Sequence, residues 1–190
     1  MNIIWHGHSC FEITGKDGTI VFDPYQANSV PGLNSLKLKA NLVLCSHEHD
    51  DHNARNCVEV APKDFKVTCI ETYHDHHQGS HRGKNTIHIV DFEDLKVVHM
   101  GDIGCMMDDV SKLKNCDVLM IPIGGYYTID TKEALKYIER IKPRIVIPMH
   151  YRSHEFGYDV LSTNEEFIQQ SSSVTYVDDC LEVNKDTKKQ

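Results

Sequence analysis

A short run of metal-binding residue types at residues 46–53 constrains this chain more than any other segment. The run reads Ser-His-Glu-His-Asp-Asp-His-Asn, and its metal-binding side chains form an H-x-H-x-D-H pattern made of His47, His49, Asp51 and His52. It directly follows the apolar run 42–45, which is typical of a buried strand. Neutral imidazole and carboxylate are ligands of zinc, and also of iron and manganese. The segment therefore predicts a metal site at the end of a strand, with a solvated polar loop as the alternative.

The spacing inside this run divides its side chains into two pairs. Alternate residues of an extended chain point to the same side, so His47 and His49 can share one ion. Asp51 and His52 lie past the following turn and can serve a second ion beside the first.

Other ligand-type residues recur downstream, each just beyond an apolar, strand-like run. They are His74, Asp102 and His150, which follow the runs 65–70, 95–98 and 144–149. In layered α/β folds, sites assemble at the carboxyl ends of strands. We therefore expect these three side chains to complete the metal site.

Metal-bound imidazoles usually donate their second N–H to a carboxylate or a carbonyl, so the site also needs supporting residues. Asp23 ends the apolar run 19–22 and is followed by Pro24, which stops the strand. We expect Asp23 either to support a ligand in this way or to be a simple turn residue.

The H-x-H-x-D-H run, the later single histidine, Gly101-Asp102 and Met149-His150 together resemble the metallo-β-lactamase fold superfamily. The segments 5–11, 20–24, 82–87, 101–104, 121–130 and 147–151 further resemble its bacterial branch of ascorbate-6-phosphate lactonases and N-acyl-phosphatidylethanolamine phospholipase D-like metal-dependent hydrolases. The resemblance extends from Met1 to about Val183. It implies an α/β fold, a four-layer αββα sandwich, in a minimal version with a single domain.

The same resemblance implies a ligand assignment. His47, His49 and His74 would bind the first metal ion. Asp51, His52 and His150 would bind the second, and Asp102 would bridge both. We take His74 as the third ligand because it is closest to the strand end. The neighbouring histidines are interpreted as a solvent-exposed polar loop or as part of the pocket rim: His76, His77 and His81.

The resemblance also implies a place near the metal cavity for His8, as a pocket residue or a support of the ligands. On sequence alone, a histidine between Gly7 and Ser9 is as readily structural. Four more residues are candidates for the pocket: Tyr126, Tyr127, Tyr151 and Arg152. Gly124-Gly125 would let the backbone approach closely, and Arg152 could hold a phosphate or a carboxylate. The alternative for all four is surface or packing, and the loop at His81-Arg82 is a lesser candidate.

The ligand set predicts a hydrolytic reaction. Two adjacent divalent ions lower the pKa of a shared water to near neutrality, and the resulting hydroxide attacks a carbonyl carbon or a phosphorus. Asp51 lies beside the attacking species, so we expect it to be the catalytic residue that orients the hydroxide and takes its proton. The prediction is a binuclear metal-dependent hydrolase acting on an ester, lactone or phosphodiester bond of a small molecule. Zinc is the default for the two ions and manganese the alternative.

A different function on the same fold is a non-hydrolytic metal-binding protein or a mononuclear iron oxygenase. The complete ligand set favours the hydrolase. Flavodiiron oxidoreductases of the superfamily resemble H-x-E-x-D-H, with glutamate where this chain has His49, so oxygen reduction is disfavoured.

Composition limits the partners. The formal net charge of −8 over 190 residues argues against nucleic acid as the main partner. No apolar run approaches the ~20 residues that span a membrane, and the N-terminus lacks the regions of a signal peptide. The seven cysteines are odd in number and form no C-x-x-C pair. We expect a cytoplasmic protein with a small-molecule substrate and no membrane partner; a homo-oligomer is left open, because lactonase-like relatives assemble.

No linker, repeat or low-complexity stretch divides the chain. We expect one hydrolase domain at residues 1–184 and a frayed polar tail at 185–190. Strands are expected at 3–5, 10–14, 19–23, 42–45, 66–71, 86–91, 96–99, 118–121, 145–147 and 174–177.

The clearest expected helix covers about 131–141, where Asp130 and Glu133 form a capping box. A second capping box, Thr163 with Glu166, predicts a helix to about 170. Shorter helices are expected after Asn53 through Val58 and over 110–114. Runs of strands closed by helices suit two sheets packed between helical layers.

Overall fold

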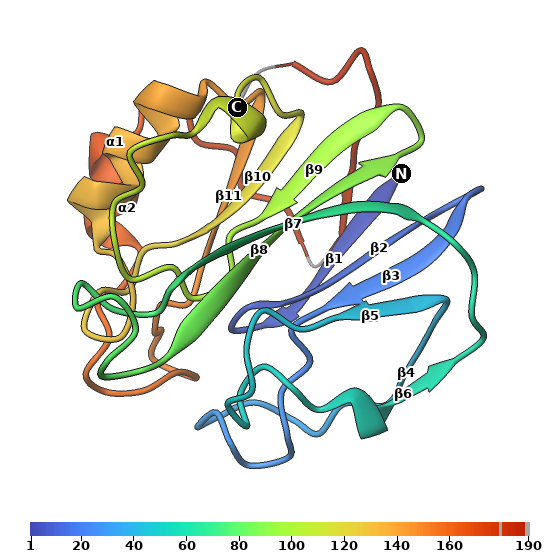
Figure 1. Cartoon of the computed structure of the whole chain (residues 1–190), viewed down its shortest axis with the longest axis horizontal. Helices are drawn as coiled ribbons and strands as arrows, with labels where there is room; N and C mark the ends of the chain where they lie inside the picture. The colour runs from blue at the N-terminus through green and yellow to red at the C-terminus, as the bar shows by residue number, and fades with distance from the viewer. Residues whose placement is uncertain (179, 189–190) are drawn as a thin grey trace.

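The computed structural model of the protein describes residues 1–178 and 180–188. Two five-stranded sheets face each other, with helices against the second sheet and loops over the first (Figure 1). The predicted α/β sandwich is confirmed, in a form with few helices.

The first sheet has the strand order β12-β1-β2-β3-β5. Its strands are β1 (Asn2–Gly7), β2 (Cys10–Gly15), β3 (Gly18–Phe22), β5 (Leu42–Leu44) and β12 (Cys180–Glu182). The second sheet has the order β11-β10-β9-β8-β7. Its strands are β7 (Lys66–Tyr73), β8 (Lys84–Phe92), β9 (Leu95–His99), β10 (Val118–Pro122) and β11 (Ile145–Met149). A small third pair joins β4 (Leu38–Ala40) to β6 (Val58–Val60).

Parallel pairing fixes which strand ends meet. β10 runs parallel to both β9 and β11, and β5 runs parallel to β3. The carboxyl ends of parallel neighbours lie at one edge of a sheet, so residues that follow β9 and β11 are brought close together. The same holds for residues that follow β3 and β5.

Alternation along β10 shows how the core divides. Val118 and Met120 are fully buried in the layer between the sheets, together with Phe11 and Phe22 of the first sheet. Leu119 and Ile121 face the other side and pack with the helical layer. A strand that is buried on both faces has a continuous run of apolar residues, so β10 could be predicted from the sequence.

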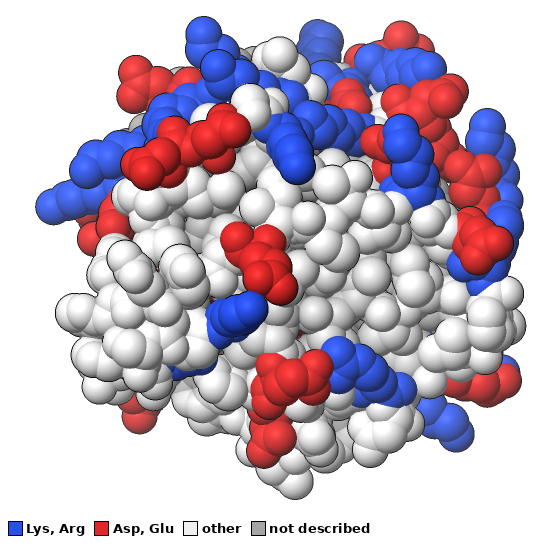
Figure 2. All heavy atoms as spheres, in the orientation of Figure 1, with Lys and Arg blue, Asp and Glu red and all other residues white. Residues whose placement is uncertain are grey.

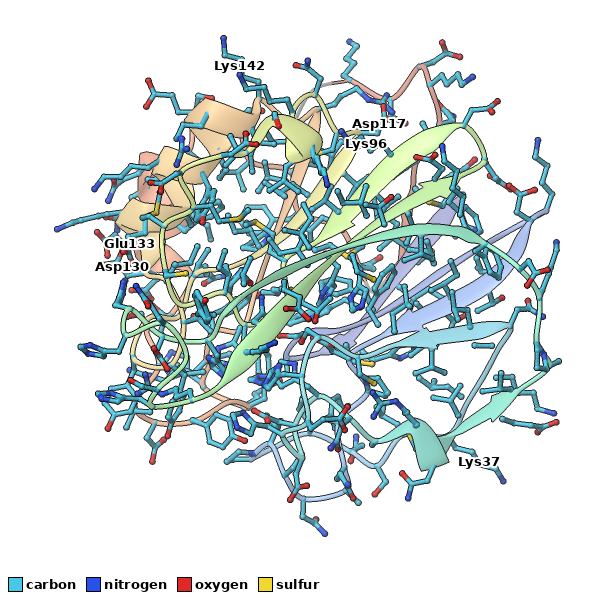
Figure 3. The ribbon with its side chains drawn as sticks, in the orientation of Figure 1. Lys37, Lys96, Asp117, Asp130, Glu133 and Lys142 are labelled. Atoms are coloured by element: carbon cyan, nitrogen blue, oxygen red, sulfur yellow. The ribbon has the colours of Figure 1, made fainter. Side chains whose placement is uncertain are left out.

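Helix α1 (Thr131–Ile141) covers the second sheet, and its capping box is confirmed. The Asp130 carboxylate accepts the Glu133 N–H at 2.9 Å, and the Glu133 carboxylate accepts the Asp130 N–H at 3.2 Å. Figure 3 shows these two side chains together at one end of α1 and Lys142 at the other. Helix α2 (Glu165–Gln170) packs Phe167 against the same core. Within the described residues, neither helix has the length and apolar character needed to cross a bilayer.

The outer face of the first sheet is covered without an α-helix. Cys10 and Val21 of the sheet pack with Tyr25 and Val30 of the loop after β3 and with Val58 of β6. The helix expected from Asn53 through Val58 is wrong: a 3₁₀ helix covers only Arg55–Cys57, and Val58 begins β6. The β-branched valines of β6 favour pairing with β4, which competes with a helix there. Likewise, the segment 110–114 forms a 3₁₀ helix over Ser111–Leu113.

Two expectations near the C-terminus are also wrong. Residues 174–177 form no strand, and Tyr176 is 79% exposed. The strand lies at Cys180–Glu182 instead, where Leu181 pairs opposite Ile3 on the open edge of β1. Helix α2 starts after Asn164 and has no side-chain cap, so the capping box of Thr163 and Glu166 does not form.

The polar tail makes more contacts than a frayed end would. The Arg144 guanidinium donates to the backbone oxygens of Asn184, Lys185 and Thr187 at 2.7–3.1 Å. This part of the tail is therefore held against the domain, while residues 189–190 of the predicted tail lie outside the described residues.

Candidate metal centre

The seven predicted ligands meet at one edge of the two sheets. The 47–52 run follows β5, and the other three residues follow β7, β9 and β11: His74, Asp102 and His150. Asp102 lies in the middle, where its Oδ2 is 2.9 Å from His150 Nε2, 3.1 Å from His52 Nε2 and 3.4 Å from His74 Nε2. Residues as far apart in the sequence as His52 and His150 thus converge on one carboxylate.

The donor atoms form adjacent groups in which all atoms lie within 4.8 Å of one another. One group is His47, His49 and His74. Another is His8, Asp51, His52 and His150, and a third, between them, is His47, His52 and Asp102. The grouping corresponds to the two neighbouring ion sites implied by the resemblance, with Asp102 between them and His8 added to the second.

Asp23 contacts the side of His52 that faces away from the donor cluster, and it also contacts Ser46. Its Oδ2 is 2.8 Å from His52 Nδ1 and 2.6 Å from the Ser46 hydroxyl, and its Oδ1 accepts the Ser46 N–H at 2.6 Å. The Ser46 hydroxyl in turn lies 2.9 Å from His47 Nδ1. Because the hydroxyl proton goes to Asp23, we assign the proton between Ser46 and His47 to Nδ1. The Nε2 atoms of both histidines are then left as lone pairs for an ion.

Several buried polar atoms of the cluster have no hydrogen-bond partner among the described residues. They include His47 Nε2 and Asp102 Oδ1. Buried polar atoms are almost always satisfied in folded proteins, so such a set marks a place for an unseen partner. Imidazole and carboxylate donors facing one another suit a divalent cation, and the residues fit the metal that the pattern implies.

The electrostatics of the cluster also call for a cation. Burial works to lower the pKa of His52, but Asp102, Asp51 and Asp23 together hold it well above its usual range. Burial would raise the pKa of Asp102, yet His150 and His52 hold it well below. The carboxylates are therefore ionised, and bound metal ions would stabilise their buried negative charge.

The remaining imidazoles are suited to act as neutral ligands. Burial, helped by nearby His52, lowers the pKa of His47 to about 3. Burial and His150 lower the pKa of His8 to about 4, and burial also lowers the pKa of His74. Histidines that are neutral at pH 7 need not lose a proton before they bind a metal ion.

The backbone around the centre is tightly constrained. His8, Asp23 and His150 have positive φ angles of 53°, 42° and 53°, a region that residues with a side chain rarely adopt. Such conformations persist only where the surrounding structure imposes them, and they are common at functional sites.

Asp102 is positioned by a buried amide. Its N–H donates to Asn85 Oδ1 at 2.8 Å, and the Asn85 amide donates to Thr72 Oγ1 and the Met100 oxygen, both at 2.9 Å. Gly101 (φ 55°) leaves no room for a side chain, because a Cβ there would lie 2.3 Å from Asn85 Oδ1. Ser46 and Asn85 were not recognised in the sequence, although both adjoin the ends of predicted strands.

Asp51 is contacted by one residue that the sequence did not indicate. Its Oδ2 lies 3.2 Å from His8 Nε2 and 3.3 Å from the Tyr158 hydroxyl. The Tyr158 hydroxyl also lies 2.8 Å from the Ser29 backbone oxygen. Tyr158 sits in an irregular loop eight positions after His150, where no periodicity or turn motif marks it.

The four predicted pocket residues separate into two pairs. Tyr126 and Tyr127 lie in the loop between β10 and α1, and the Tyr127 ring is 5.9 Å from the Tyr158 ring. Tyr151 instead stacks on Trp5 at 5.7 Å and lines an apolar groove between β1, β11 and α2. Arg152 Nε donates to the Leu161 backbone oxygen at 2.6 Å. Tyr151 and Arg152 are thus engaged in packing and loop contacts.

The histidine-rich loop after His74 is organised by Asp75. The Asp75 carboxylate accepts four backbone N–H groups at 2.7–3.0 Å, those of His77, Gly79, His81 and Arg82. His76, His77 and His81 are exposed, and the His77 and His81 rings lie 4.2 Å apart. These histidines are outside the three donor groups, which agrees with the choice of His74.

Comparison with known proteins identifies the family. The profile of the Beta-lactamase superfamily domain matches residues 2–150. A UPF0173 metal-dependent hydrolase of Staphylothermus marinus is 30% identical over 216 residues, covering 89% of this chain and 90% of its own. The related protein Ta0764 of Thermoplasma acidophilum is 29% identical over 193 residues, covering 82% and 85%.

Solved structures agree with the sequence relatives. A metallo-beta-lactamase superfamily protein of Thermotoga maritima superposes with a TM-score of 0.77 at 28% identity, covering 96% of this chain and 91% of its own. The metallo hydrolase Igni18 of Ignicoccus hospitalis shares the fold, with a TM-score of 0.64 at 20% identity over 89% of each chain. The chain belongs to the metallo-beta-lactamase superfamily.

Proposed function

We propose that this protein is a metal-dependent hydrolase that uses two divalent ions to cleave an ester, lactone or phosphodiester bond of a small molecule. The observation that carries the proposal is the convergence of six ligand-type side chains around Asp102, with buried donor atoms that lack a partner among the described residues. The names of the relatives as metal-dependent hydrolases support it. Zinc is the expected metal for this donor set, and manganese is the alternative.

Each ligand residue has a defined task in this proposal. His47, His49 and His74 would hold one ion, Asp51, His52 and His150 would hold the other, and Asp102 would be available to both. When bound, two such ions provide a water molecule of near-neutral pKa and polarise the substrate oxygen under attack. Asp23 keeps His52 and, through Ser46, His47 in the orientation that presents Nε2.

Asp51 is the proposed catalytic residue. Burial would raise its pKa, but His52 and the hydrogen bond from His8 hold that pKa well below the usual range. The carboxylate is therefore ionised at neutral pH. Its Oδ2 can orient the attacking water and accept a proton from it, while His8 and Tyr158 fix the position of that oxygen.

The proposal is tested by elemental analysis of protein purified without added metal, beside a hydrolysis screen. The screen uses bis-4-nitrophenyl phosphate, lactones and 4-nitrophenyl esters with the wild type and the Asp51→Ala variant. We expect about two equivalents of zinc or manganese and turnover that Asp51→Ala loses. The substrate that is cut then identifies the bond class.

Two other results would contradict the proposal. A bound metal with no turnover on any of these bond classes favours a non-hydrolytic metal-binding protein. A single equivalent of iron, with oxygen consumption in place of hydrolysis, favours a mononuclear oxygenase on the same fold.

A further inference from the structure

Three loops meet beside Asp51 and carry a cluster of side chains, of which the proposed chemistry uses only Tyr158. They join β7 to β8, β10 to α1, and β11 to α2, and they lie side by side at the lower left of Figure 1. Together they contribute four side chains, which we name the rim: Arg82, Tyr126, Tyr127 and Tyr158.

The rim is continuous from the metal centre outwards. The Tyr158 hydroxyl is 3.3 Å from Asp51 Oδ2, and its ring packs edge-on against Tyr127 at 5.9 Å. The ring centroids of Tyr127 and Tyr126 are 4.8 Å apart. The Arg82 guanidinium lies over both rings, 5.4 Å from the centroid of Tyr127 and 6.0 Å from that of Tyr126. A bound molecule whose reacting bond lies at Asp51 would therefore extend along Tyr158 and Tyr127 towards Arg82.

Arg82 differs from the other arginines of the chain. Arg55 pairs with Glu48, Arg144 with Asp117, and the remaining two donate to backbone oxygens: Arg140 and Arg152. Within residues 1–178 and 180–188, the Arg82 guanidinium has no acceptor and makes only the two ring contacts. A guanidinium carries five N–H donors in a fixed planar fork, and that fork matches a carboxylate or a phosphate.

Arg82 is also held in place relative to the metal centre. The Arg82 N–H donates to Asp75 at 2.7 Å, and Asp75 directly follows the candidate ligand His74. The His74 N–H donates to the Gly83 oxygen at 3.1 Å, which closes the loop on the other side of Arg82. The two rings limit the side chain further, so little conformational freedom remains to be lost when an anion binds.

The surrounding surface leaves the guanidinium as a distinct positive feature. Figure 2 shows most of the Lys, Arg, Asp and Glu along the upper and right margins and some at the centre and lower middle, whereas the lower left is largely uncharged. The nearby Glu133 carboxylate faces His76, with 3.8 Å between His76 Nε2 and Glu133 Oε1. Charges on an otherwise neutral surface are weakly compensated and attract a counter-ion effectively.

We propose that Arg82 is a specificity residue that binds a second anionic group, a carboxylate or a phosphate, on the substrate. That group lies at the end of the molecule opposite the bond to be cut, with the chain between them resting on Tyr127 and Tyr158. The inference rests on the proposed hydrolase function and narrows its substrates to small anionic molecules.

The test compares matched substrate pairs that differ by one carboxylate. For carbon centres the pair is mono-4-nitrophenyl glutarate and 4-nitrophenyl pentanoate. For phosphorus it is 2-carboxyethyl 4-nitrophenyl phosphate and propyl 4-nitrophenyl phosphate. We expect Arg82→Gln to lower kcat/KM about 10- to 100-fold for the charged member and less than about threefold for its partner. Arg82→Lys, which keeps the charge but not the fork, should fall between the two.

Lys37→Gln is the matched control, because it removes the same charge from an exposed side chain beside β4 and β6 (Figure 3). Lys37→Gln should leave the preference for the charged member of each substrate pair unchanged. An equal loss on both members of a pair in Arg82→Gln would overturn the proposal, and so would a wild type with no preference for the charged member.

A binding measurement separates this inference from the hydrolase proposal. Glutarate and phenyl phosphate are titrated by calorimetry into the wild type and into Arg82→Gln, both as purified, so that any binding of the anion to metal is common to the two proteins. About tenfold weaker binding to Arg82→Gln than to the wild type supports the anion site even if no substrate is cut. Equal binding to both overturns it. The tighter of the two probes identifies the anion as carboxylate or phosphate.

Discussion

At the scale of single residues, the candidate centre depends on side chains that hold the ligands as much as on the ligands. Asp23 is fully buried and contacts His52 and Ser46, and through Ser46 it orients His47. Burial would raise its pKa, but the neighbouring His52 and His99 hold it well below the usual range, so it remains charged. One carboxylate therefore fixes imidazoles of both proposed ion sites.

The Asp23→Asn variant tests this role. An amide has one acceptor oxygen and an NH₂ group, so it cannot accept all three of the bonds that Asp23 accepts. We expect metal affinity to fall about 10- to 100-fold, as measured by competition with a chromophoric chelator. Ser46→Ala removes the hydroxyl that links Asp23 to His47 but leaves the bond between Asp23 and His52, so it should weaken metal binding less. Unchanged affinity in Asp23→Asn would show that the ligands orient themselves.

Gly104 gives a second prediction at this scale. A Cβ at this position would lie 2.4 Å from the His74 carbonyl carbon and 2.6 Å from the Asp75 nitrogen. Gly104→Ala should therefore displace His74 and lower the bound metal, measured by elemental analysis, while Gly83→Ala in the loop between β7 and β8 should not. A Cβ at Gly83 meets nothing within 4 Å, although its φ of 85° makes that variant somewhat less stable. Full metal content in Gly104→Ala would contradict the placement of His74.

At the scale of elements, the strands place histidines in the core as well as at the site. His88 on β8 is 4% exposed and pairs opposite His99 on β9. Burial lowers the pKa of His88 to about 4 from its ordinary value of 6.5. The folded protein thus keeps this side chain neutral, whereas the unfolded chain binds a proton below pH 6.5.

His88 should make the fold sensitive to acid. Because the unfolded state binds the proton first, the stability contributed by neutral His88 is present above pH 6.5 and is lost as the pH falls towards 4. By pH 5 the loss amounts to about 2 kcal/mol. Urea unfolding at pH 7.5 and pH 5 should show a smaller decrease in His88→Leu than in the wild type. Equal decreases would mean that His88 is not the group that titrates.

At the scale of the whole molecule, the candidate centre joins the two sheets. Its residues follow strands β3 and β5 of the first sheet and β7, β9 and β11 of the second. Without a cation, the cluster brings buried carboxylates and imidazoles together, and several of their atoms have no partner in residues 1–178 and 180–188. An ion bound between the sheets should therefore stabilise the entire fold, because the site does not exist in the unfolded chain.

Chelation provides the corresponding test. With metal at about 1,000 times its Kd, binding contributes about 4 kcal/mol, so treatment with a chelator should lower Tm by about 10 °C. Returning zinc or manganese should restore it. Asp102→Asn removes the shared carboxylate, and its Tm should respond little to chelator or metal. A wild-type Tm that does not respond to chelation would contradict a site that links the sheets.

The sequence by itself determined the features that depend on local order. The H-x-H-x-D-H run, His74, Asp102 and His150 each follow a strand, and the capping box of α1 forms where it was predicted. Periodicity and turn chemistry act over a few positions, so such features are visible in one dimension.

Only the tertiary structure decided what depends on distant partners. Tyr158 and Arg82 are brought to Asp51 and Tyr127 by loops far apart in the chain, whereas Tyr151 packs on Trp5. Residues 174–177 have strand-like composition, yet the open edge of β1 is paired by Cys180–Glu182. Strand pairing and side-chain contacts are set by which surfaces meet, and burial of those surfaces outweighs the weak local preference of any one segment.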